Sequence, residues 1–501
     1  MLGKDCMKVF KKFGLAVLVL ALTAGATSVR AQATNEIGQL QQQLLQMQEN
    51  FDRVQREQKA QIDALTQKLE AFTKAQSAAE EKQKLQTQLA AEMSADTTNA
   101  PAAPEKKPWS PADTFTVARA GSAYMNMSFD GMMAVGGSTK SAPSQFLQLG
   151  DHDPQKNGFS LRNAEIALDG AVDPYFKGFA NIVLKLDNNN ETSIELEEAY
   201  LQSTTLPANL QVKAGQFFAN FGRQNSQHPH TWAFVDQPII LGRAFGPDGL
   251  RSIAAQLSWL VPTPFYTEAF LSVLDGQGST SFSFRNPGEP DTLGVNRFYG
   301  RATTSRSLEG AGDLVFVPRL ASSFELTDEQ TLVLGASAAF GPNDTGADAR
   351  TEIYGVDAYW KWKPADADAG FPFVSWQTEL LYRRFGAAAD PTALPILRAE
   401  NLTDWGGYSQ VLWGFKPRWV TGLRGEYATG NSAANDAGDP YRGERYRFSP
   451  VLTFFPSEFS KIRLQYNYDM LQANAFLPSR DENSLFLMYE IALGAHGAHK
   501  F

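Results

Sequence analysis

Within residues 460–471, polar and apolar side chains alternate from Lys461 to Met470, and this pattern restricts the possible folds more than any other feature of the sequence. The apolar positions include Ile462, Leu464 and Tyr466, whereas the positions between them are Lys461, Arg463, Gln465, Asn467 and Asp469. Successive side chains of a β-strand point to opposite faces, so one face here is apolar and the other charged. A lysine or arginine facing the middle of a bilayer costs roughly 2–4 kcal/mol. The pattern therefore predicts a membrane-spanning barrel strand with lipid outside and water inside.

The same alternation recurs through the last four-fifths of the chain. We predict sixteen strands, near 124–135, 159–170, 175–187, 193–203, 210–217, 252–259, 265–274, 314–326, 331–340, 351–363, 373–385, 408–416, 418–430, 444–455, 460–471 and 484–494. Most have the ~9–13 residues that a tilted transmembrane strand requires. Mean hydropathy is only −0.30, which a barrel tolerates because its strands are half polar.

Short and long connections alternate along the chain of predicted strands. Short segments follow the even-numbered strands, whereas most connections after odd-numbered strands are long: 136–158, 218–251, 275–313, 386–407, 431–443 and 472–483. Outer-membrane barrels have short periplasmic turns and longer external loops. The predicted fold is thus an all-β transmembrane barrel of about 16 antiparallel strands, spanning residues 113–501, in the bacterial outer membrane with lipid around it.

The N-terminal residues predict an exported protein. Lys4, Lys8, Lys11 and Lys12 precede an apolar segment, and 31–33 reads Ala-Gln-Ala, so residues 1–33 resemble a cleaved signal peptide. Cys6 is the only cysteine and lies within it. The mature chain is therefore expected to contain neither disulfides nor a thiolate nucleophile.

Residues 34–95 predict an N-terminal α-helical coiled coil in the periplasm. Apolar residues recur at spacings of three and four, including Leu40, Leu44, Met47, Phe51, Leu65 and Leu69. This is a heptad pattern, which favours a self-associating helix, and the alternative is a lone helix packed on a neighbour. Residues 96–112 contain four prolines and predict a semi-rigid linker.

Charged residues on the polar faces of the strands are candidates to line the pore. These are Lys185, Lys361, Arg383, Arg424, Arg445, Arg447, Lys461, Arg463, Glu165, Asp187, Glu379, Glu426, Asp469 and Glu490. Charged rings set ion selectivity in pores. Both signs are present, so we expect weak selectivity, and a charge-balanced wall without preference is the alternative.

The connection 218–251 is a candidate constriction loop. Its length and its aromatic residues predict that it folds into the barrel, and the alternative is an external flap or a trimer contact. The candidate residues are Arg223, His228, His230, Trp232, Asp236 and Arg243.

Four of the five histidines form two pairs, His228 with His230 and His496 with His499. Two imidazoles can share a zinc or copper ion, but a site needs three or four ligands. We therefore expect loop histidines without a metal, and no cofactor. No catalytic motif is present, which predicts that the chain is not an enzyme, and the net charge of −9 argues against nucleic-acid binding.

Several motifs resemble the phosphate-selective porin O and P family. They are Gly-Phe-Ser-Leu-Arg-Asn-Ala-Glu at 158–165, Val-Asp-Pro-Tyr-Phe at 172–176, Glu-Leu-Glu-Glu-Ala-Tyr-Leu at 195–201, and Gly-Gln-Phe at 215–217 followed by Phe-Gly-Arg at 221–223. Asn220 stands where the family has proline. The resemblance implies sixteen strands, a homotrimer and passive diffusion of solutes. It also implies that the C-terminal Phe501 is read by the barrel-assembly machinery. Phosphate selectivity does not carry over, because this wall mixes charges of both signs.

The sequence therefore predicts an outer-membrane porin that allows passive diffusion of small hydrophilic solutes or ions. One alternative is a divalent-metal (zinc) uptake channel. Another is a structural tether that joins the outer membrane to the cell wall through the coiled coil.

Overall fold

The computed structural model describes residues 114–140, 147–187, 189–431, 439, 442–473 and 478–494. The predicted signal peptide, coiled coil and linker lie outside the described residues, as do His496, His499 and Phe501. The described residues cover nearly all of the predicted barrel.

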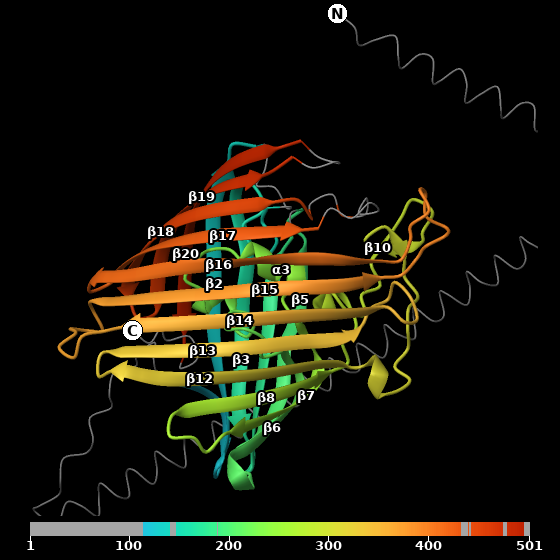
Figure 1. Ribbon diagram of the computed structural model, residues 1–501. Coiled ribbons are helices and arrows are strands. Elements are labelled where there is room, and N and C mark those ends of the chain that lie inside the picture. The colour runs from blue at the N-terminus through green and yellow to red at the C-terminus, as the bar shows by residue number, and fades with distance from the viewer. Residues whose placement is uncertain are drawn as a thin grey trace, which may run out of the picture. The chain divides into compact units, whose positions relative to one another are not determined.

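Sixteen strands form one closed antiparallel ring (Figure 1). Each strand pairs with the next along the chain, β8 pairs with β12, and β2 pairs with β20 to close the ring. The strands are β2 (Ala123–Ser138), β3 (Gly158–Ala171), β4 (Phe176–Leu186), β5 (Thr192–Ser203), β6 (Leu210–Phe218), β7 (Arg251–Leu260), β8 (Tyr266–Leu274), β12 (Val315–Thr327), β13 (Gln330–Pro342), β14 (Arg350–Trp362), β15 (Phe373–Ala387), β16 (Glu400–Lys416), β17 (Trp419–Gly430), β18 (Arg445–Ser457), β19 (Ser460–Leu471) and β20 (Arg480–Leu493). The predicted sixteen-stranded antiparallel barrel is confirmed.

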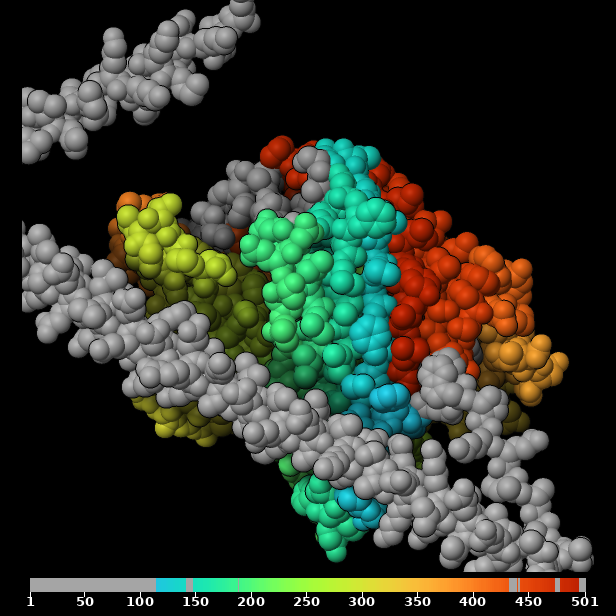
Figure 2. Space-filling model, turned by 180° about the vertical axis from the view of Figure 1, so that it is seen from behind, coloured from blue at the N-terminus to red at the C-terminus, as the bar shows by residue number. Residues whose placement is uncertain are grey.

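The seam of the ring joins its first and last strands. Figure 2 shows the cyan β2 lying beside the red C-terminal strands on one face of the barrel. A short strand, β1 (Phe115–Ala120), precedes the ring and pairs with the beginning of β2, with every residue exposed. The sequence did not predict β1.

The connections include a few small elements. A three-stranded sheet of β9 (Glu289–Pro290), β10 (Asn296–Phe298) and β11 (Arg301–Ala302) lies between β8 and β12. The helical segments are η2 (Pro207–Asn209), η3 (Pro229–Thr231), α3 (Ile239–Phe245), η4 (Ser279–Ser281) and η5 (Ala311–Asp313). In the described part of the chain, no helix is long and apolar enough to cross a bilayer.

The prediction was wrong about where β16 begins. β16 begins at Glu400 and not near 408, although its first half contains Asp404 and a Gly406–Gly407 pair, which are uncommon in strands. A Cβ at Gly406 would overlap the carbonyl oxygen of Tyr427, and one at Gly407 would overlap that of Glu379. These glycines therefore let neighbouring backbones come close together. Asp404 is stabilised by ion pairs inside the barrel.

The outer face of the ring is apolar and exposed. Side chains that point outward near mid-strand include Leu320, Leu334, Val356, Leu380, Val411, Leu423, Leu452, Leu464, Leu485 and Leu487. The inner face carries buried charges, as predicted, but it also carries an apolar region that the sequence pattern did not indicate. Val317, Ile353 and Leu381 face inward and pack against the connection between β6 and β7.

The outward face of β12 offers a direct test of membrane embedding. Leu320 and Leu326 lie on the same face and are each 51% exposed, but Leu320 is near mid-strand whereas Leu326 is near the turn. We expect Leu320→Arg to lower the free energy of unfolding in lipid vesicles by about 2–4 kcal/mol, and Leu326→Arg by only about 0–1 kcal/mol. Urea titration of both variants measures this difference. Equal costs would show that this face does not contact the bilayer core.

Candidate functional site

The connection between β6 and β7, residues 219–250, lies inside the barrel and forms its most elaborate internal feature. Its apolar residues Phe221, Ile239 and Phe245 are almost fully buried, in one cluster with inward-facing residues of the wall. The helix α3 contacts β15, β16 and β17 and is visible within the ring (Figure 1). We call residues 219–250 the internal loop. Burial of its apolar side chains favours the inward position.

The ends of α3 are fixed by the wall and by a glycine. The first helical backbone amide, that of Ile239, donates a hydrogen bond of 2.6 Å to Glu426 Oε2 of β17. This carboxylate satisfies one of the amides that a helix N-terminus leaves unpaired. Gly246 follows the helix with φ of +83°, where a Cβ would lie 2.7 Å from the Phe282 side chain. A larger residue does not fit at this position.

One anchor of the internal loop is Asp236. Its carboxylate forms ion pairs with Arg424 and Arg447, and accepts hydrogen bonds from Gln465 Nε2 (2.8 Å) and Asn467 Nδ2 (2.6 Å). Burial alone would raise the pKa of Asp236, but the two arginines lower it by more, so that the net pKa is about 2. Because this is below the ordinary value, the stabilisation is present above a pH of about 4 and is lost as the pH falls towards 2.

A second anchor surrounds Arg243, at the end of α3. Its guanidinium lies 3.1 Å from Asp404 Oδ1 and 2.7 Å from Asp439 Oδ2. Arg383 Nε donates to Asp404 Oδ2 at 2.9 Å, and Arg383 NH1 donates to the carbonyl oxygen of Arg243 at 2.9 Å. Arg442 NH1 also donates to Asp404, at 2.7 Å. This network holds the C-terminal end of α3 against β15 and β16.

The third anchor is a cluster of histidines and carboxylates at the opposite side of the loop. His228 Nδ1 lies 2.8 Å from Glu197 Oε2, and its Nε2 lies 2.9 Å from Glu198 Oε2. His230 Nδ1 lies 3.0 Å from Glu165 Oε2. Burial lowers the pKa of His228, but Glu197 and Glu198 raise it more, so the net pKa is well above the usual value. In the absence of another cation, His228 is therefore held as an imidazolium.

Basic residues of β18 and β19 also lie close to the internal loop or to the wall beside it. Arg463 donates to the carbonyl oxygens of Trp232 (2.8 Å) and Phe234 (3.2 Å), and Lys461 pairs with Glu490 at 2.9 Å while donating to the His230 carbonyl. Arg447 lies 2.6 Å from Asp469. The internal loop therefore occupies hydrogen-bonding groups of Arg463 and Lys461.

The other residues predicted to line the pore occupy several different places. Glu379 accepts hydrogen bonds from the amides of Arg223 and Gln224, and Arg445 is buried on the inner face of β18. Lys185 pairs with Asp151 and Glu195, and Lys361 lies over the Phe373 ring. Asp187 is at the end of β4, where it accepts hydrogen bonds from the amides of Asn189 and Glu191. Asp187 thus stabilises the turn to β5.

Glu197 and Glu198 were missed as candidates because both cannot face inward in a regular strand. The pairing of β4 with β5 aligns Asn181 with Glu198 and Ile182 with Leu196, so Glu197 is the extra residue of a β-bulge. Both glutamates are consequently buried. Two adjacent acids in an alternating strand were the only signal for this bulge, and bulges are common beside functional sites.

A polar cavity remains between the internal loop and the wall formed by β14, β15 and β16. Its volume is about 140 Å³, and it is lined by Arg223, Gln224, Gln227, Thr231, Ala233, Tyr359, Ser375, Gln377, Gln410 and Leu412. The Arg223 guanidinium lies 3.9 Å from the centre of the Tyr359 ring. Among the described residues, no carboxylate is recorded within ion-pair distance of Arg223. The cavity is therefore polar and locally cationic.

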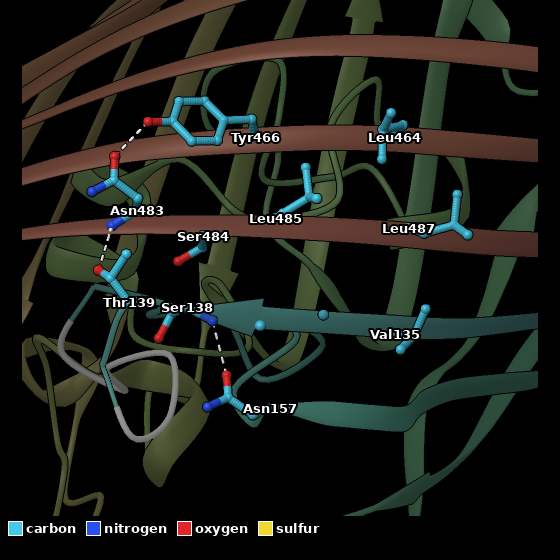
Figure 3. Close-up of a pocket in the computed structure, with 12 residues that line it drawn as sticks. Val135, Ser138, Thr139, Asn157, Leu464, Tyr466, Asn483, Ser484, Leu485 and Leu487 are labelled. Atoms are coloured by element: carbon cyan, nitrogen blue, oxygen red, sulfur yellow. Dashed lines mark hydrogen bonds between the residues drawn. The ribbon is translucent and has the colours of Figure 1, made fainter.

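A second hollow lies on the outside of the barrel, where β19 and β20 meet β2 (Figure 3). Its volume is about 800 Å³. Val135, Leu464 and Leu487 form one end, and the other end is polar, with Ser138 N donating to Asn157 Oδ1 at 2.9 Å. This hollow belongs to the seam of the ring and does not open into the lumen region around the internal loop.

No family model matches the chain. An uncharacterized protein of Aquifex aeolicus (strain VF5) is 32% identical over 362 residues, which covers 69% of this chain and 71% of that protein. The chain belongs to the family of that Aquifex protein. Membership extends over most of this chain, but it brings no assigned activity.

Two solved structures with a similar fold are an outer membrane channel and a porin. The outer membrane channel DcaP of Acinetobacter baumannii has 13% identity and a TM-score of 0.51, covering 76% of this chain and all of that one. An anion-selective porin from Comamonas acidovorans has 8% identity and a TM-score of 0.46, covering 74% and 100%. The DcaP likeness shows that the chain has the fold of a porin-like β-barrel. It does not single out the phosphate-selective group.

The Asp236 anchor generates a testable prediction. Asp236→Asn leaves Arg424 and Arg447 without their shared carboxylate, and breaking a buried pair in this way costs about 3–5 kcal/mol. We expect faster protease cleavage within 219–250 and a lower free energy of unfolding. The control is Asp366→Asn, at an exposed position in the turn between β14 and β15. Equal protease resistance of the two variants would contradict the role of Asp236 as an anchor.

Proposed function

We propose that the chain forms an outer-membrane channel through which small hydrophilic solutes or ions diffuse passively. The observation that carries this proposal is the closed ring of sixteen strands with an apolar outer face and a charged inner face. Lipid-facing charges are costly and lumen-facing charges are not, so this distribution suits a wall between lipid and water. The porin-like fold supports the same function.

The internal loop sets the size of the proposed channel. Its three anchors hold residues 219–250 across the interior, where they occupy space that an open barrel would leave to water. The polar cavity beside Arg223 is space left between the loop and the wall. We propose that solutes pass along this side, which limits them to small polar molecules. A homotrimer and a periplasmic coiled coil remain part of the proposal.

Electrical recording tests the channel directly. We expect the full chain, purified in detergent and inserted into a planar bilayer, to give stepwise ohmic conductance in potassium chloride. Asp236→Asn is expected to increase the step size, because loosening the loop widens the path. A membrane that contains correctly folded protein but shows no conductance steps would refute the channel proposal.

Arg223 predicts the sign of ion selectivity. Its guanidinium lines the polar cavity without a recorded carboxylate partner among the described residues, and a cation beside a narrow path favours anions. We expect Arg223→Gln to shift the reversal potential in a salt gradient towards cation preference. The matched control is Arg384→Gln, because Arg384 is an exposed residue paired with Glu352 on the outer face. Identical shifts in both variants would place the selectivity filter elsewhere.

A further inference from the structure

The third anchor, the cluster of histidines and carboxylates between the internal loop and the wall, has features that an ion-pair network alone does not require. Four polar groups converge there from three strands and the loop: Glu165 of β3, Asn181 of β4, Glu197 of β5 and His228. All four residues are buried. We propose that these four side chains bind one divalent transition-metal ion, with Zn²⁺ as the ion that best matches the ligands.

The spacing of the four groups matches a tetrahedral site. Zinc binds nitrogen and oxygen ligands at about 2.0–2.1 Å, so ligand atoms of a regular tetrahedron lie about 3.3–3.4 Å apart. His228 Nδ1 is 2.8 Å from Glu197 Oε2 and 3.9 Å from Glu165 Oε2. Asn181 Nδ2 is 2.7 Å from Glu197 Oε2, 3.2 Å from Glu165 Oε2 and 3.2 Å from His228 Nδ1. These separations bracket the tetrahedral value.

Asn181 can supply the fourth ligand. Its side chain is fully buried, and its Nδ2 atom faces the other three ligand atoms. Turning the amide by half a rotation exchanges Nδ2 with Oδ1 and directs the oxygen at those atoms instead. Nδ2 then takes the position in which Oδ1 has no hydrogen-bond partner among the described residues.

The surrounding residues would orient the ligands. His228 uses Nδ1 towards the proposed ion, and its Nε2 lies 2.9 Å from Glu198 Oε2. A metal-bound histidine usually donates its other ring N–H to a carboxylate in this way. Asn163 Nδ2 likewise donates to Glu165 Oε1 at 2.6 Å, and Oε2 of that carboxylate is directed at the site, where it also lies 3.0 Å from His230 Nδ1. Two carboxylates, a neutral imidazole and a divalent ion also sum to zero charge.

A neighbouring group of possible ligands is less suitable. Asp151, His152 and Asp248 also converge, but Lys185 forms an ion pair with Asp151. A bound lysine ammonium already neutralises that carboxylate and occupies the place of a cation. The two ligand carboxylates of the cluster around His228 pair instead with histidines, His230 with Glu165 and His152 with Glu197. A histidine can release its proton near neutral pH more easily than a lysine, so this cluster is the better metal site.

Metal analysis of the full chain tests the proposal. The protein is purified in detergent, stripped with a chelator, dialysed against Zn²⁺ and then against metal-free buffer, and its zinc is measured by mass spectrometry. We expect about one zinc ion per chain. Glu197→Gln and His228→Gln should abolish stoichiometric binding, and Glu198→Gln should weaken it about 10–100-fold, the usual effect of removing an orienting carboxylate.

Glu195→Gln is the matched control, since Glu195 is on the same strand and pairs with Lys185 and Arg251 instead. It should retain zinc. Wild-type protein with no more zinc than Glu197→Gln would overturn the proposal, and so would equal zinc in all variants. If a variant fails to fold, cobalt(II) bound to the wild-type protein decides the question. Intense visible absorption typical of tetrahedral cobalt supports the site, and its absence refutes it.

The consequence for transport rests on the proposed channel function. A metal that joins three strands to the internal loop would hold the loop in place, so chelation should enlarge the conductance steps and added Zn²⁺ should restore them. Zinc content is measured without any reference to conductance. A protein that binds zinc but does not conduct would therefore retain the metal site and refute only the channel.

Discussion

Every backbone amide and carbonyl that faces lipid must find its hydrogen-bond partner within the protein, and this constraint governs the whole structure. An open sheet would leave two unpaired edges in the bilayer, whereas pairing of β2 with β20 removes both. Closure also divides every strand into an outward and an inward face. The outer face must be apolar where it contacts the bilayer core, so charged side chains near mid-strand lie inside the ring. The position of the internal loop and of its anchors follows from that division.

Inside the ring, charge pairing takes the place of a conventional core. Arginines on β15, β17, β18 and β19 are buried, and they are stabilised by carboxylates such as Asp236 and Asp404 or by loop carbonyl oxygens. An isolated charge in such a position would be very costly. The internal loop supplies both the apolar packing surface of α3 and the polar groups that complete the pairing, so the wall and the loop stabilise each other. The two kinds of contact together define which space inside the ring remains unfilled.

The sequence predicted the strands well because alternation is a local signal that the membrane enforces. It failed at the start of β16, where Gly406 and Gly407 are present for close approach of neighbouring backbones, a cause that only the pairing reveals. It indicated that the loop folds inward from its aromatic residues, and it identified His228, Asp236 and Arg243. It could not find their partners, since Glu197 and Glu198 both face inward only because of a bulge. The sequence did not predict the proposed metal site, because its ligands come together only when the internal loop folds against three neighbouring strands, β3, β4 and β5.

The anchors of the internal loop also have a bearing on the order of assembly. Asp236 and its partners on β17 and β19 are separated by 188 to 231 residues along the chain. Contacts with such large sequence separation form only after the chain entropy of the intervening segment has been lost. The loop precedes those strands in the chain, so its docking requires that β17 and β19 have already joined the wall. Closure of the ring and completion of its interior are therefore coupled.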